Sequence, residues 1–329
     1  MFLIKKLLHT LVVLLFLAAI RATSAPMDTT GLPITTRGVI HMDFDTGGRS
    51  PFAVTLGQYF LGTSGRNARD WQEILGFDLT QDVSGITCGL IPGSPAGSSP
   101  QGIFILRGNF SPAKVVATAL RKGAKSKTIG KYAFIDVGSL PELVPFGKKR
   151  KILFAAINNR TLLLADEDSA SAAVEALDGK TPSYKAAETP TTFAEKAGVP
   201  FLYVYLDKAL FPSAKPDNME TLLPPDEVQI VLSDNGHNVA FRFAATYPLA
   251  LDAQRAKARF QALLGLFRMA PSESRNASEK ALEEKLSQLH AAAKLDGTDR
   301  KFNLSVNYPT SDAIWLLANA APKPGAINL

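Results

Sequence analysis

His41, Asp43 and Asp45 are the residues whose type and spacing come closest to a reactive or metal-binding group. They alternate with apolar residues along Gly38–Asp45, which predicts a half-buried strand with the three side chains on one face. Imidazole and carboxylate groups bind metals. Alternate residues on a strand lie ~6–7 Å apart, which is wide for three bonds to one ion. We interpret this face as solvent-facing and keep the three residues as candidate ligand-binding or metal-binding residues.

Two further segments match motifs of serine acyl-transfer enzymes. Ser111-Pro112-Ala113-Lys114 has the pattern Ser-x-x-Lys, and Ser233-Asp234-Asn235 lies downstream. In serine β-lactamases and penicillin-binding proteins these motifs provide an acylated serine and a nearby lysine that handles its proton. No Lys-Thr-Gly or Lys-Ser-Gly segment follows here. Ser111 is explained as a helix cap before Pro112, and the second motif is typical of a hairpin turn, so we reject this chemistry.

Other catalytic signatures are missing from the sequence. It contains no Gly-x-Ser-x-Gly, His-Glu-x-x-His, phosphate-binding glycine loop or paired-cysteine metal motif. His41, His237 and His290 are far apart in sequence, which leaves a histidine-based hydrolase little to use. We therefore predict no catalytic residue, no cofactor-binding residue and no cofactor.

The N-terminal segment has the three parts of a secretory signal peptide. Lys5 and Lys6 precede the apolar run Leu7–Ile20, and small or polar residues follow at Ala22–Ala25. The apolar run is shorter than the roughly 20 residues that span a bilayer. Cleavage after Ser24 is favoured because cleavage after Ala25 would leave a proline first; a retained anchor is the other alternative. The protein is therefore expected in the periplasm or outside the cell.

Charge and cysteine content narrow the compartment and the partners. The full chain carries a formal charge of +6, and loss of Lys5, Lys6 and Arg21 with residues 1–24 leaves +3. That charge is too small and dispersed to indicate nucleic acid. The basic run Lys148, Lys149, Arg150 and Lys151 is interpreted as a solvated loop, or as a contact for anionic lipid at a membrane surface.

Cys88 is the only cysteine, so the chain has no internal disulfide. Export without disulfides fits a bacterial periplasm or cell envelope better than an animal extracellular space. Cys88 lies in the apolar run Ile86–Ile91, which predicts a buried structural thiol.

The order of expected elements predicts an α+β protein of two similar halves, each an antiparallel sheet with helices packed on one face. Hairpins are expected around Asn158–Arg160 and Asp234–Gly236, and helices over 114–122, up to Leu177, 251–269, 282–293 and 312–319. We divide the chain into a signal peptide (1–24), a flexible lead-in (25–36), a first half (37–185), a second half (186–322) and a C-terminal tail (323–329).

One segment resembles a known group of sequences. Gly102–Phe110, followed by Pro112-Ala113-Lys114, is similar to a segment that recurs in uncharacterised exported bacterial envelope proteins. Gly130-Lys131-Tyr132 and Ala176–Lys180 occupy comparable places. The resemblance covers about residues 80–185 and implies a secreted α+β protein. Its motifs are structural, so it transfers no active-site residue.

These observations favour a non-enzymatic periplasmic or envelope protein that binds an envelope protein partner or an apolar ligand between its two sheets. Export, a large core and the missing catalytic motifs support it. Two alternatives stay open: an envelope hydrolase that uses carboxylates such as Asp43 and Asp45, and a structural scaffold that self-associates through strand edges.

Overall fold

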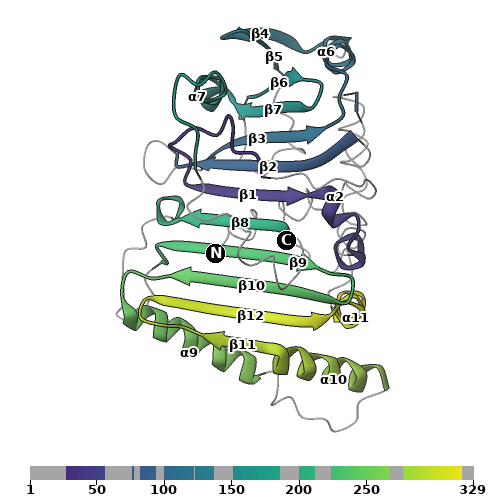
Figure 1. Cartoon of the computed structure of the whole chain (residues 1–329), viewed down its shortest axis with the longest axis vertical. Coiled ribbons are helices and arrows are strands. Elements are labelled where there is room, and N and C mark those ends of the chain that lie inside the picture. The colour runs from purple at the N-terminus through teal and green to yellow at the C-terminus, as the bar shows by residue number, and fades with distance from the viewer. Residues whose placement is uncertain are drawn as a thin grey trace.

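A computed structural model describes residues 27–55, 76–77, 82–93, 100–121, 123–136, 151–185, 200–211, 224–266 and 277–320. Within them the protein is a mixed α+β fold built on one 12-stranded antiparallel sheet, in the order β11-β12-β10-β9-β8-β1-β2-β3-β7-β6-β5-β4 (Figure 1). The expectation of a separate sheet in each half is wrong. The central strands β1 and β8 pair with each other, with Val39 opposite Tyr205, and this pairing makes the sheet continuous.

The strands are β1 (Gly38–Asp43), β2 (Val83–Ile91), β3 (Gln101–Gly108), β4 (Lys125–Ile129), β5 (Tyr132–Asp136), β6 (Ile152–Asn158), β7 (Thr161–Asp166), β8 (Pro200–Asp207), β9 (Glu227–Asp234), β10 (Asn238–Thr246), β11 (Ala293–Asp296) and β12 (Lys301–Pro309). The helices in the described residues are α2 (Phe44–Gly47), α6 (Pro112–Arg121), α7 (Glu167–Leu177), the 3-10 helix η1 (Lys208–Leu210), α9 (Ala250–Leu266), α10 (Ala277–Ala292) and α11 (Thr310–Ala320).

The two halves of the chain occupy separate parts of this sheet. The first half contributes β1-β2-β3-β7-β6 and the second β8-β9-β10-β12-β11, each counted outward from the centre. The first half then continues through β5 to β4 at its outer edge. Since β11 and β4 are the two outermost strands, the second-half strands β9, β10 and β12 each have a hydrogen-bonded neighbour on both sides.

Helices cover both faces of the first half. Successive side chains of a strand point to opposite faces. On β7, Leu162 and Leu164 pack with Val115 and Ala119 of α6. Leu163 of the same strand packs in a different cluster, which contains Ala170, Ala173 and Val174 of α7. The prediction of helices on one face is therefore wrong in this half, because β7 is apolar on both sides and needs a covering layer on each.

The second half is covered on one face by α9, α10 and α11. Phe243 and Leu304 are opposite each other on β10 and β12 and pack with Phe260 of α9. The opposite face of the same strands bears polar side chains such as Arg242 and Ser305, which are also paired and are half-exposed. The alternation of apolar and polar residues along β10 and β12 matches a sheet that faces solvent on one side.

Turn residues account for several boundaries that the sequence predicts. Gly123, Gly179 and Gly236 have φ values of +88°, +69° and +84°, which favour glycine. Gly123 ends α6, Gly179 follows α7, and Gly236 completes the β9–β10 hairpin that the sequence predicts. The first helical residue of α6 is Pro112, as predicted, and the residue before α7 is Asp166. Strands β4 and β11 were not predicted; both are short and lie at the sheet edges.

The segment 27–36, which lies within the expected lead-in 25–36, packs against the fold. Leu32 is fully buried beside α7 residues in the core. Its carbonyl oxygen accepts a 2.7 Å hydrogen bond from the Tyr184 amide, and Pro33 forms a β-bridge with Ser183. A chain segment with this many ordered backbone bonds belongs to the folded body.

Candidate ligand-binding cavity

A cavity of about 580 Å³ lies in the second half, between the sheet and the helices α10 and α11. Its floor is formed by β9, β10 and β12, and its walls by the two helices and by Phe52, one of the helical residues 51–55. The lining residues are Phe52, Leu232, Val239, Phe241, Leu286, Leu289, His290, Ala293, Leu304, Val306, Tyr308, Ala313, Leu316 and Leu317. This volume is in the range of small-molecule binding sites, ~300–1,000 Å³.

The lining follows from the pattern of the elements that form it. Val239 and Phe241 are alternate residues of β10, so both point to the cavity face of the sheet. Tyr308 and Val306 lie opposite them on β12 and point to the same face. Leu286 and Leu289 belong to the helix stripe that the sequence predicts with Leu282. The stripe is half-buried rather than sealed against the sheet. A space therefore remains between apolar surfaces, which the linear pattern could not reveal.

Polar contacts at one side of the cavity join α10 to α11 and β12. Lys285 Nζ lies 2.5 Å from Asp312 Oδ1 and 5.7 Å from the centre of the Trp315 ring. Tyr308 Oη donates a 2.9 Å hydrogen bond to the Lys285 carbonyl oxygen. The hydrogen bond to Asp312 raises the pKa of Lys285, and burial raises the pKa of Tyr308. Both side chains keep their protons at neutral pH and hold α10 in place.

His290 differs from the rest of the lining. It is half-buried in the last turn of α10, and no hydrogen bond or ion pair joins its ring to another residue in the described part of the chain. It is the single basic or acidic side chain among the described residues that line the cavity. Its position was not predictable from the sequence, because its neighbours in space come from β10, β12 and α11.

The predicted candidates His41, Asp43 and Asp45 lie elsewhere. His41 and Asp43 are in β1 at the centre of the sheet, and Asp45 is in α2. All three are buried, with Asp43 only 3% exposed, so the interpretation of a solvent-facing strand is wrong. Strand β1 is buried because β2 and β8 flank it and each of its faces belongs to a packed cluster, Ile40 and Met42 to one and Val39 to the other. Within the described residues no cluster of three His, Cys, Asp or Glu could hold a metal ion.

The contacts of these residues are those of structural groups. Asp43 caps α2 by accepting hydrogen bonds from the Thr46 amide at 2.9 Å and the Thr46 hydroxyl at 2.6 Å. His41 Nδ1 and Thr87 Oγ1 are hydrogen-bonded at 3.0 Å between neighbouring strands. An N-cap carboxylate and a cross-strand pair are ordinary ways to satisfy buried polar atoms. The geometry therefore gives no support to a carboxylate hydrolase at this place.

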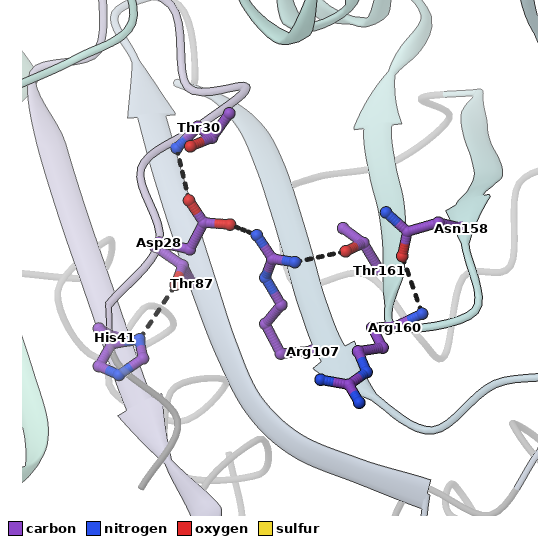
Figure 2. A network of polar contacts seen from close by, with 8 residues as sticks. All are labelled: Asp28, Thr30, His41, Thr87, Arg107, Asn158, Arg160 and Thr161. Atoms are coloured by element: carbon purple, nitrogen blue, oxygen red, sulfur yellow. Dashed lines mark hydrogen bonds and ion pairs between the residues drawn. The ribbon is translucent and has the colours of Figure 1, made fainter.

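Figure 2 shows a second set of polar residues close to His41. Arg107 of β3 forms an ion pair with Asp28 and donates a 2.5 Å hydrogen bond to Thr161 Oγ1 of β7. Asp28 Oδ1 also accepts from the Thr30 amide at 2.8 Å. Burial lowers the pKa of Arg107. The network anchors the N-terminal segment across the strands, and each of these polar groups is occupied by it.

The remaining predicted residues have the following places. Cys88 is buried in β2, as expected, and burial raises the pKa of its thiol, so it stays protonated. Lys148, Lys149 and Arg150 lie outside the described residues. Lys151 is exposed just before β6, 3.8 Å from Glu167. The signal peptide and the expected Ser24 cleavage site also lie outside them. No helix in the described ranges is long and apolar enough to cross a membrane.

Comparisons with known proteins find likeness only among solved structures. No protein-family model matches the chain, and no curated protein matches it. Crystal form III of TP0453 aligns over 92% of this chain and 100% of its own, with 7% identity and a TM-score of 0.46. Crystal form IV gives 8% identity and 0.45, and form I gives 7% and 0.41. Likeness at this level carries no argument about function.

Proposed function

We propose that this chain is an exported, non-enzymatic protein that binds an apolar ligand in the cavity between α10, α11 and the sheet. The observation that carries the proposal is the lining, which is aliphatic or aromatic apart from His290 and the Tyr308 hydroxyl. Burying a ligand there would remove apolar surface of both partners from water, at about 25 cal/mol per Å². The ligand would lie on one face of the second half, not between two sheets.

Filling the cavity tests this proposal. Ala313 and Ala318 are both in α11, but Ala313 lines the cavity whereas Ala318 is exposed. Ala313→Phe should weaken binding of a fluorescent hydrocarbon probe, such as a diphenylhexatriene, at least about tenfold, because the ring would occupy the ligand's space. Ala318→Phe is the matched control and should bind as the parent chain does. Equal probe binding by all three proteins, or none by the parent, would overturn the proposal.

Export remains part of the proposal. The sequence pattern of residues 1–25 supports a cleavable signal peptide, and the single buried thiol supports a disulfide-free periplasm or envelope. In the cell envelope the protein is also expected to contact an envelope protein or a membrane surface. The basic residues for the membrane contact are Lys148, Lys149, Arg150 and Lys151. N-terminal sequencing of the mature chain should begin at Ala25; an intact Met1 would contradict cleavage.

We also infer that the halves 37–185 and 186–322 are copies of one unit. The repeated order β1-β2-β3-β7-β6 and β8-β9-β10-β12-β11 supports this, as do α6 and α9, which follow the corresponding strands β3 and β10. Superposing the two sets of five strands tests it, and strands out of register would contradict it. Self-association through the outer strands gains little support, because the edge strand β4 exposes Lys125 and Lys127, which discourage pairing.

A further inference from the structure

His290 is the feature of the cavity that an entirely apolar ligand leaves unexplained. Its half-buried ring lies among Leu286, Leu289 and the apolar floor without a hydrogen-bond partner in the described residues. An imidazole on an otherwise apolar wall offers a ligand atom a hydrogen bond, and a hydrogen bond made away from bulk water is stronger than one made in it. A carboxylate or hydroxyl oxygen would accept a hydrogen bond from an imidazole N–H.

The backbone around the cavity excludes a peptide added as a strand. Strands β9, β10 and β12 are each hydrogen-bonded on both sides, so their amides and carbonyls are already paired. The Tyr308 hydroxyl already donates a hydrogen bond to the Lys285 carbonyl oxygen. An extended peptide brings many backbone polar groups, and the described lining offers them one imidazole. An extended peptide is therefore a poor occupant.

From these contacts we propose that the ligand is a single-chain amphiphile, a hydrocarbon tail with one small oxygen-bearing head group that His290 contacts. The inference rests on the proposed function and names the ligand class of the same cavity. The tail would lie against Phe241, Val306 and Leu316, and the head would lie at the end of α10. A diacyl phospholipid fits less well. Its phosphate brings more charge than one imidazole can neutralise, and its two tails are bulky for a cavity of this volume.

Displacement of the hydrocarbon probe by matched twelve-carbon ligands tests the inference. Lauric acid, dodecanol and dodecane, each below its aggregation limit, are compared in the parent chain and in His290→Leu. We expect the substitution to lower the affinity for lauric acid at least about tenfold, since a hydrogen bond to a charged group contributes about 1.5–3 kcal/mol. Dodecane and the probe should bind the variant as well as the parent. A fatty acid one CH₂ shorter than lauric acid should bind with about fourfold lower affinity.

His237→Leu is the matched control, because His237 is exposed at the β9–β10 turn and does not line the cavity. It should leave all three affinities unchanged. If the probe binds but lauric acid is unaffected by His290→Leu, the head-group assignment fails while the apolar cavity stands. If a short-chain phospholipid displaces the probe better than lauric acid, the single-chain class is wrong. If no probe binds the parent chain, the proposed function itself fails.

Discussion

The two halves of the sheet share a strand order but differ in how many faces they bury. Strand β7 has Leu162 and Leu163 on opposite faces, and α6 and α7 cover one each. Its counterpart β12 has Val306 on the helix face and Ser305 on the other. The first half therefore has helices on both faces of the sheet. The second gathers α9, α10 and α11 on one face, where α10 and α11 do not close completely over the sheet.

This difference explains why the cavity is in the second half. In the first half Phe134 and Phe154 are completely buried and fill the corresponding space above and below the sheet. In the second half Phe241 and Phe243 are half-exposed on the covered face. The same strand arrangement thus supports a filled core at one end and leaves an apolar cavity at the other.

The largest difference between the halves is expected when one carboxylate is introduced on the strand β7 of the first half and on its counterpart β12 of the second. Leu163 is 1% exposed beneath α7, so Leu163→Glu buries an unpaired charge and should cost at least about 3–5 kcal/mol of unfolding free energy. Ser305→Glu lies between Arg242 and Lys294 on the polar face and should change it by less than about 0.5 kcal/mol. Urea unfolding of both variants measures the difference; similar losses would mean that both faces of β12 are buried.

Removal of one aromatic ring from each half should have the next largest effect. Phe154→Ala empties a fully buried site and should cost about 3–5 kcal/mol. Phe241→Ala only enlarges an existing cavity, so we expect a loss of about 1–2 kcal/mol. Thermal and urea unfolding of the pair provide the measurement. A loss for Phe241→Ala equal to that of Phe154→Ala would show that the space above β10 is closed in solution.

Acid should destabilise the protein only weakly, and the effect should be found at α7 in the first half. Hydrogen bonds from Lys127 and Lys131 lower the pKa values of Glu167 and Asp178, at the two ends of α7. A lowered pKa stabilises the fold above the ordinary values of 4.5 and 3.8, and this contribution is lost as the pH falls below them. The protection factors of the α7 amides, which compare each exchange rate with its intrinsic rate at the same pH, should therefore fall slightly below about pH 4. The double variant Glu167→Gln, Asp178→Asn should lose this dependence; an unchanged dependence would assign it to other groups.

Local signals in the sequence identified most of the elements but not their partners. Pro112, Gly123 and the Asp234–Gly236 turn mark boundaries by backbone preferences that need no tertiary contact. Strand β4 was missed because its residues are exposed and lack an apolar face. The interpretation of His41, Asp43 and Asp45 as solvent-facing failed because burial of a central strand depends on its flanking strands, β2 and β8, and on the residues packed over its faces, which come from distant parts of the chain.

The cavity shows the same limit more clearly. The sequence predicts the helix that becomes α10 and the β9–β10 hairpin, but the pairing that sets Arg242 opposite Ser305 on one face comes from the tertiary structure. Periodicity states which face of an element is apolar, but not how tightly it is covered. His290 became a candidate only when α10 was placed beside β12 and α11.

The sequence by itself therefore determined the α+β class, most strand and helix positions, the turns and the buried thiol, because these depend on nearest neighbours and on the periods of 2 and 3.6 residues. The tertiary structure alone decided that both halves share one sheet, that helices lie on both faces of only the first half, and that an apolar space with a single imidazole remains in the second. These features depend on the distances between elements, which packing sets and linear spacing does not encode.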